Sequence, residues 1–395
     1  MIYLDYQATT SLAPEAFAAM EPWLKIGFAN PHSAHAPGRA AAAAVEFARD
    51  QVAALLPPGG RVIFTSGATE AINLAIMGVG LPVSAAATEH AAVLDCVQHL
   101  GGNILPIDLR WGGGSCLATD GGALQILPEK GRWHAAGVTE GAGDKPPHIA
   151  ADPLRHALRG PPPQAGEELL AVMLVNNEIG TIQPIANLAA AAHAQNKLFL
   201  CDAVQAFGRM PIPDGPDMIA ISAHKIHGPK GIGALWVRDG VSLAPQMLGG
   251  GQEQGMRSGT LSPALCAGFG AAAKLAAERM EMDAVHVSAL WDRALAAFAD
   301  WTINGAMTER YKGNLNIRRE GVDAARLISE CREIAFSAGS ACASGSGRPS
   351  HVLRAIGLTD AQAKSSIRLG FGRYTTAEEI DIAAEAINRA AEAML

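Results

Sequence analysis

Four short apolar runs near the middle of this 395-residue chain constrain its fold more than any other feature. They occupy residues 169–175, 198–202, 218–222 and 232–237. A helical pattern over residues 185–197 separates the first two runs, and each run has the length and composition of a buried strand. Strands that alternate with helices imply a mainly parallel sheet covered on both faces, with ligands at the carboxyl ends of its strands. The sequence therefore predicts an α/β fold.

Polar residues that follow these runs can do chemistry on a cofactor. Asp202 ends the second run, and a carboxylate there can hold a pyridinium nitrogen protonated, which turns the ring into an electron sink. Gln205, three residues on, can face the same ring. Lys225 follows the run that ends at Ser222, where partial desolvation and a cationic neighbour such as Lys230 can lower its pKa enough to form a Schiff base with a carbonyl cofactor. A solvated loop lysine is the alternative interpretation, because lysine is rarely buried.

Two further segments supply the rest of a pyridoxal phosphate (PLP) site. Residues 61–70 have the pattern of a strand, a glycine turn and the start of a helix, which aims backbone N–H groups and the helix dipole at an anion. Ala68 and Thr69 are therefore candidates to hold the phosphate. His90 offers a flat ring that can stack on the cofactor and carry protons near neutral pH. Each signal alone is also common in plain structure, but the ordered set is specific.

The ordered motifs resemble those of group I PLP-dependent cysteine desulfurases, within the class V aminotransferase superfamily. They span nearly the whole chain in the family's order: Thr-Ser-Gly-Ala-Thr-Glu at 65–70, Thr-Glu-His at 88–90, Val-Asn-Asn-Glu-Ile-Gly at 175–180, Asp-Ala-Val-Gln at 202–205, Ser-Ala-His-Lys at 222–225, Arg-Ser-Gly-Thr at 257–260 and Ser-Ala-Gly-Ser-Ala-Cys at 337–342. The resemblance implies the PLP-dependent transferase fold type I, with a mainly parallel seven-stranded sheet covered by helices. It implies a large PLP-binding domain at residues 14–255 and a smaller α+β domain, with the catalytic cysteine loop, at 1–13 and 256–395.

The resemblance also implies which residues bind the cofactor and the substrate. The implied cofactor-binding set is Ala68, Thr69, His90, Asn177, Asp202, Gln205, Ser222, His224, Lys225 and Thr260. In the family, Asn177 would bond the ring oxygen, and Thr260 would reach across a homodimer interface to close the phosphate site of the other subunit. Arg368 lies in the family's motif for the substrate carboxylate, which a guanidinium can grip with two parallel hydrogen bonds. For any single arginine, a surface ion pair is the alternative.

Cys342 is surrounded by small residues that neither bury nor rigidify it, and an exposed cysteine of this kind can become a thiolate. The resemblance implies conversion of L-cysteine to L-alanine, with Lys225 as the base and His90 handling the proton of the substrate thiol. Cys342 would take the sulfur as a persulfide and pass it to an acceptor or scaffold protein. The family uses this sulfur for iron–sulfur cluster assembly, for other thio-cofactors or for tRNA thiolation.

Other functions stay open at this point. A selenocysteine lyase is the closest alternative, followed by another class V PLP enzyme such as an aminotransferase. Cys342 argues against a simple transaminase, which needs no thiol. A non-catalytic scaffold that binds sulfur-transfer partners is less favoured, because Lys225, Asp202, His90 and Cys342 are all present.

Composition disfavours several other classes of protein. With 49% hydrophobic and 17% charged residues the chain is globular, and its net charge of −7 opposes non-specific binding to nucleic acid. The six cysteines show no zinc-type spacing, so no metal site is expected, and reduced thiols in the cytoplasm are favoured over disulfides. The uncharged run between Glu70 and Glu89 contains glycine and proline, which favours a buried helix, a turn and a strand over a membrane span.

Local signals also predict an insertion and several helix starts. Residues 110–165 are punctuated by glycine and proline and are expected to form an insertion of loops and short strands, favoured as surface decoration over a partner-binding element. Ser262 followed by proline predicts the start of a long helix. Asp323 is expected to cap another helix, and a capping box at 376–379 precedes the last one.

Overall fold

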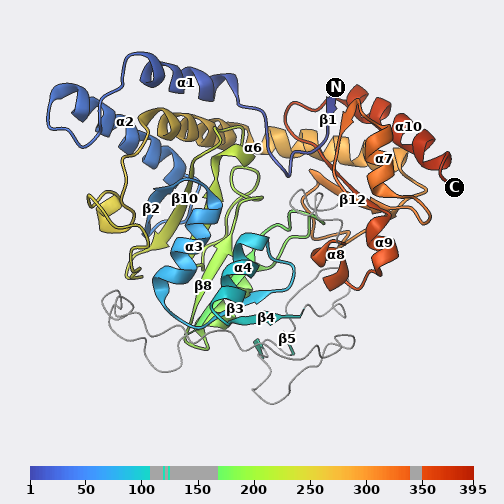
Figure 1. The fold of residues 1–395 in the computed structure, drawn as a ribbon, viewed down its shortest axis with the longest axis horizontal. Helices are drawn as coiled ribbons and strands as arrows, with labels where there is room; N and C mark the ends of the chain where they lie inside the picture. Colours follow the sequence, from blue (N-terminus) through green and yellow to red (C-terminus); the bar gives the residue numbers. More distant parts are fainter. Residues whose placement is uncertain (107–118, 121–122, 125–167, 339–348) are drawn as a thin grey trace, which may run out of the picture.

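The computed structural model describes residues 1–106, 119–120, 123–124, 168–338 and 349–395 (Figure 1). Most of the predicted insertion at 110–165 and all of residues 339–348, with Cys342, lie outside the described residues. Within the insertion the structure describes two short paired strands, β5 (Thr119–Asp120) and β6 (Ala123–Leu124).

A seven-stranded sheet forms the centre of the part of the chain that the structure describes. In spatial order its strands are β2 (Gly60–Thr65), β10 (Gly233–Arg238), β9 (Met218–Ser222), β8 (Lys197–Asp202), β7 (Glu168–Met173), β3 (Val83–Ala86) and β4 (Asn103–Leu105). Strand β10 runs antiparallel to both of its neighbours, and the other adjacent pairs are parallel. The predicted mainly parallel α/β sheet is therefore confirmed.

Helices cover both faces of this sheet, as Figure 1 shows. On one face α1 (Pro14–Lys25), α2 (Ala36–Ala53), α5 (Ile185–His193) and the first half of α6 (Pro263–Ala297) form a core with side chains such as Val62 and Phe64. On the other face α3 (Ala68–Val79) and α4 (Ala91–His99) pack on Ile63 and its neighbours. Successive strand residues point to opposite faces, so burial of both faces explains the uninterrupted apolar runs.

A second core surrounds a smaller antiparallel sheet, in which the described strands β11 (Thr302–Ile303), β12 (Asn314–Arg318) and β14 (Ser366–Gly370) lie side by side. Helices α7 (Ala324–Glu330), α10 (Ala377–Glu392) and the second half of α6 enclose this core. Because α6 contributes Phe269 to the first core and Trp291 to the second, both cores share one helix. The domain division near residue 255 stays a prediction.

The chain returns to this second core from its other end. Strand β1 (Ile2–Tyr3) pairs in parallel with β13 (Ile334–Ala335), and the short helices α8 (His351–Ala355) and α9 (Asp360–Lys364) precede β14. In Figure 1 the blue β1 lies among the orange and red C-terminal elements. The segment that follows β1 then runs back toward the large sheet, which places it between the two cores.

The predicted helix starts are confirmed by their capping bonds. The Ser262 side chain accepts from the backbone of Leu265 at the start of α6, and Asp323 caps α7. Thr376 and Glu379 form the capping box of α10. The run between Glu70 and Glu89 folds as α3, a turn and β3, as expected. Among the described residues, every helix is too short or too polar to cross a membrane.

Candidate active site

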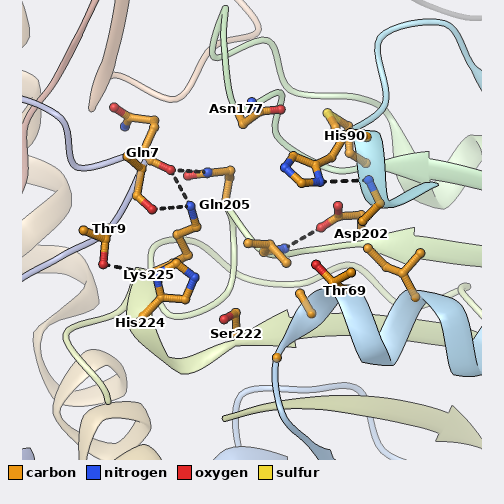
Figure 2. A pocket seen from close by; sticks show the side chains of 18 of the residues that line it. Gln7, Thr9, Thr69, His90, Asn177, Asp202, Gln205, Ser222, His224 and Lys225 are labelled. Atoms are coloured by element: carbon orange, nitrogen blue, oxygen red, sulfur yellow. Dashed lines mark hydrogen bonds between the residues drawn. The ribbon is translucent and has the colours of Figure 1, made fainter. Parts of the chain in front are cut away.

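A cavity of about 800 Å³ opens at the carboxyl ends of β7, β8 and β9 (Figure 2). Predicted site residues gather in its wall: Ala68, Thr69, His90, Asn177, Asp202, Gln205, Ser222, His224, Lys225 and Arg368. They come from segments that lie up to 300 residues apart in the sequence, from Ala68 to Arg368. Thr260 is exposed and lies outside this wall, and Cys342 belongs to the residues that the structure does not describe.

Lys225 ends a single helical turn, η2 (Ala223–Lys225), directly after β9. Its Nζ donates to the backbone oxygens of Gln7 at 2.5 Å and of Ala8 at 2.8 Å. Burial, helped by the nearby cations Arg209 and Arg368, lowers the pKa of Lys225 to about 7. Much of the amine is therefore uncharged near neutral pH, as a nucleophile or a base requires.

The sequence offered Lys230 as an example of such a cation, whereas the cations that lower the pKa of Lys225 in the structure are Arg209 and Arg368. Burial, followed by the nearby cations Lys225 and Lys230, lowers the pKa of His224 to about 4. The guanidinium of Arg209 lies beside Lys225 because its Nη2 donates to the Lys225 backbone oxygen at 2.7 Å. Arg209 lies four residues after Gln205, and its Nη1 donates to Gln205 Oε1 at 2.9 Å.

The N-terminal segment fixes the lysine turn, a role that sequence reasoning missed. The Thr10 hydroxyl donates to the His224 backbone oxygen at 2.9 Å and accepts from the His227 amide at 2.7 Å. The Gln7 backbone oxygen also accepts from Gln205 Nε2 at 2.9 Å (Figure 2). The polar run Gln-Ala-Thr-Thr directly after the first strand was the available signal. Residues 7–10 thus hold Lys225 and its turn in the cavity wall.

Asp202 and His90 face each other across the cavity floor (Figure 2). Asp202 Oδ1 accepts from the Val204 amide at 3.0 Å, while burial raises the pKa of this carboxyl. His90 caps α4, its Nδ1 accepting from the Ala92 amide at 3.1 Å, and burial lowers the pKa of the imidazole. A neutral ring whose Nδ1 accepts carries its hydrogen on Nε2. Near neutral pH the His90 ring is therefore uncharged, with its hydrogen on Nε2.

The start of α3 can cradle an anion in the cavity wall. Gly67 precedes the helix in an extended conformation, and the backbone of Ala68 and Thr69 opens the first turn. Unpaired N–H groups and the helix dipole at such an end favour a phosphate. Strand β10 approaches closely here: a Cβ on Gly233 would lie only 2.8 Å from the Gly67 Cα.

A charged pair holds this cradle in place. Glu70 Oε2 accepts from the Ser66 amide at 2.7 Å, and Glu70 Oε1 accepts from Arg257 Nε at 2.7 Å. Arg257 belongs to the glycine-rich stretch that also carries Thr260. The pair therefore anchors the segment of Thr260 to the proposed phosphate site, a role that the sequence did not indicate for either residue.

Arg368 forms the wall on the side of the second core and is only 1% exposed. Its Nη2 donates to Asp5 Oδ1 at 2.7 Å and to the Ser337 hydroxyl at 2.8 Å, and its Nη1 donates to the Asn177 backbone oxygen at 3.0 Å. Among the described residues, Nε of this guanidinium and Oδ1 of Asn177 have no partner. Buried polar atoms of this kind require a partner, which fits a site that binds a polar ligand.

Glu178 is a further cavity residue that sequence reasoning missed. Its side chain is fully buried, burial raises its pKa, and Oε2 accepts from the Ser350 hydroxyl. His351, the next residue along, also lines the cavity and contacts the Glu89 backbone oxygen through Nε2 at 2.9 Å. The signal was the charged residue within the Asn-Asn-Glu-Ile-Gly turn. These contacts attach the start of α8 to the cavity wall.

The residues of the cavity fit PLP. A lysine amine with a lowered pKa, a buried carboxylate, an imidazole and a helix start line one space. The amine suits the aldehyde of that cofactor and the carboxylate suits its pyridine nitrogen. The imidazole suits the face of its ring and the helix start suits its phosphate. The orphaned Asn177 Oδ1 and Arg368 Nε add polar groups without partners among the described residues.

Comparisons with known proteins agree with this geometry. The family model described as aminotransferase class-V matches residues 2–107 and 151–382, and the unmatched stretch overlaps the predicted insertion. The cysteine desulfurase IscS of Rickettsia akari (strain Hartford) is 40% identical over 404 residues, covering 98% of this chain and 90% of the relative. That of Rickettsia bellii (strain OSU 85-389) is also 40% identical, with the same coverage.

A solved structure is similar throughout. The NifS-like protein from Rickettsia africae ESF-5 has a TM-score of 0.78 and 26% sequence identity, and the match covers 99% of both chains. With a family model matched over most of the chain and relatives at 40% identity over nearly its full length, this protein belongs to the class-V aminotransferase family, among its PLP-dependent cysteine desulfurases.

Proposed function

We propose that the protein converts L-cysteine to L-alanine and holds the released sulfur on Cys342 as a persulfide. The observation that carries this proposal is Lys225, an amine whose pKa falls to about 7 in a cavity that also contains the Asp202 carboxyl and the Arg368 guanidinium. These three groups suit, in turn, proton transfer at a substrate carbon, a cationic ring and a substrate carboxylate.

Each part of PLP has residues suited to hold it. Asp202 would face the pyridine nitrogen, with His90 stacked on the ring and Gln205 and Asn177 near the ring oxygen. The amides of Ala68 and Thr69, with Ser222 and His224, would hold the phosphate. When bound, the cofactor supplies an electron sink for the substrate carbon.

The chain's own groups would then move protons and sulfur. Lys225 takes the α-proton of the substrate, since a neutral amine is available at neutral pH. Arg368 holds the substrate carboxylate, and His90 handles the proton of the substrate thiol. The Cys342 thiolate attacks the substrate sulfur, so a sulfur–sulfur bond forms as the Cβ–S bond breaks. The α-proton then returns from Lys225 to Cα, and a second proton, delivered to Cβ, completes alanine.

The proposal includes two kinds of partner. A second copy of the chain would place Thr260 at the phosphate site of the other subunit; in support, Thr260 is exposed and Arg257 ties its segment to Glu70. A sulfur-acceptor or scaffold protein in the cytoplasm would take the persulfide sulfur for iron–sulfur cluster assembly or tRNA thiolation. The relatives named IscS support a role in sulfur delivery.

The test is a visible spectrum of the purified protein followed by a cysteine-dependent sulfide assay. We expect a yellow protein that forms alanine and, with a thiol reductant, sulfide in equal amounts. A colourless protein that takes up no PLP would favour a non-catalytic scaffold instead. Faster alanine formation from selenocysteine than from cysteine would favour a selenocysteine lyase instead.

Replacing Arg368 by lysine is expected to raise KM for L-cysteine about 10- to 100-fold with a smaller change in kcat, because an ammonium cannot make the two parallel hydrogen bonds of a guanidinium. Steady-state alanine formation measures both constants. The matched control is Arg373→Lys, a largely buried arginine paired with Asp283 outside the cavity wall, for which KM stays near the wild-type value. An unchanged KM in Arg368→Lys would remove this residue from the substrate site.

A further inference from the structure

The turn at residues 177–180 places Asn177 in the cavity wall. The side chain of the preceding residue, Asn176, holds two backbone amides of this turn. Asn176 Oδ1 accepts from the amides of Glu178 at 2.9 Å and of Ile179 at 3.0 Å. Gly180 has a φ of +72°, a conformation that glycine adopts without strain. The amides of Glu178 and Ile179 are thus satisfied within the turn, so the carbonyls of the turn need partners from elsewhere.

Two asparagines of β12 supply partners for the first two carbonyls. Asn314 Nδ2 donates to the Asn177 backbone oxygen at 3.1 Å, and Asn316 Nδ2 donates to the Glu178 backbone oxygen at 3.0 Å. Arg368 Nη1 reaches the same Asn177 oxygen from the adjacent strand β14. The backbone oxygen of Asn177, in the turn after β7, therefore accepts from both Arg368 of β14 and Asn314 of β12.

The next two carbonyls are held by the loop before β12. Arg310 Nη2 donates to the Ile179 backbone oxygen, and the Tyr311 amide donates to that of Gly180 at 2.9 Å. Every backbone oxygen from 177 to 180 thus accepts a hydrogen bond from the second core. The turn is a fixed joint between the two cores, with Asn177 at its cavity end.

The asparagines occupy positions where an apolar side chain would be expected. Both are 0% exposed, and alternate residues of β12 place them on one face of the strand. On the opposite face Leu315 and Ile317 pack in the second core. A buried amide destabilises a fold unless its hydrogen bonds are made. The Asn-x-Asn pattern therefore serves the turn, and Asn316 Oδ1 also accepts from Asn304 Nδ2 at 2.7 Å.

We propose that Asn314 and Asn316 are positioning residues for the PLP reaction, and that they set Asn177 relative to Arg368 by holding the carbonyls of the turn. The proposal rests on the proposed function, in which Asn177 faces the cofactor and Arg368 faces the substrate carboxylate. Asn314 has the larger role, because it shares the Asn177 oxygen with Arg368.

The test replaces each asparagine by leucine, which has a similar volume and no donor. We expect Asn314→Leu to raise KM for L-cysteine and Kd for PLP about tenfold each, because that factor corresponds to the loss of one buried hydrogen bond. We also expect the visible absorbance maximum of bound PLP to shift. Asn316→Leu is expected to act in the same direction. The control is Asn388→Leu on α10, which removes hydrogen bonds to Trp301 and Ala297 in the same core but lies away from the cavity.

A merely structural role predicts a different result. In that case Asn314→Leu and Asn388→Leu lower Tm alike, and both keep the wild-type spectrum, KM and Kd. A folded Asn314→Leu protein with the wild-type spectrum, KM and Kd would therefore overturn the proposal. Asn314→Ser, with its smaller polar side chain, takes the place of the leucine variant where that variant does not fold.

A double-variant cycle gives a sharper criterion. If Asn314 positions Arg368, the increase in KM caused by Arg368→Lys is smaller in the Asn314→Leu background than in the wild type. Additive effects on KM contradict the proposal. The PLP spectrum and Kd need no turnover, so a wild-type protein that binds PLP but fails to release sulfide removes the proposed function and leaves this test intact.

Discussion

Replacing Lys225 by alanine is expected to abolish the visible absorbance of the lysine-bound cofactor and to lower sulfide formation by about 10³-fold or more, the scale of a lost general base. The Nζ atom lies at the end of β9, where burial brings its pKa to about 7 and two backbone oxygens fix its position. Alanine removes both the covalent attachment and the base.

Borohydride reduction and peptide mapping measure the attachment directly. In the wild type, reduced PLP is expected on the peptide that contains Lys225, and in Lys225→Ala on no peptide. Lys274→Ala on the exposed side of α6 is the control and keeps the colour and the rate. Reduced cofactor on another lysine of the wild-type protein would contradict the assignment of Lys225.

Replacing Cys342 by serine is expected to keep the colour and lose sulfide release, because a serine hydroxyl does not form the nucleophilic anion that a thiol does. The described cysteines are poor candidates for that role. Burial raises the pKa of Cys96, Cys201, Cys266 and Cys331, to about 12 for Cys266, so their thiols stay protonated at neutral pH. The residues outside the described part contain Cys116 and Cys342.

Mass spectrometry after treatment with L-cysteine measures the sulfur directly. We expect one extra sulfur atom on the peptide of Cys342 in the wild type and none in Cys342→Ser. Cys116→Ser is the matched control and is expected to retain both the modification and the sulfide release. Wild-type desulfuration by Cys342→Ser would show that another thiol accepts the sulfur.

Features of the fold with short-range causes could be predicted from the sequence. The caps at Ser262, Asp323 and Thr376 depend on neighbours within a few residues, and the apolar runs report burial of each strand by itself. The sheet followed from these runs together with the helices between them. The ordered motifs likewise placed Asp202 and Lys225 beside one cavity.

Contacts between distant segments could not be predicted in this way. Gln7 is 218 residues from Lys225, and Asp5 is 363 residues from Arg368, so no local pattern signals either pair. Lys230 was chosen as the neighbouring cation because it is close in sequence, whereas the folded chain brings Arg209 and Arg368 to the amine. Long-range packing, rather than any motif, sets the electrostatics of the site.

The pairing of β1 with β13 has a consequence for biosynthesis. The first strand is synthesised long before its partner strand β13. Arg368, which pairs with Asp5 in the folded protein, is synthesised 363 residues after it. At typical elongation rates of 5–20 residues per second that delay is about 20–70 s. The first strand therefore emerges without its native neighbours, and the cavity wall gains Arg368 only after β14 has been synthesised.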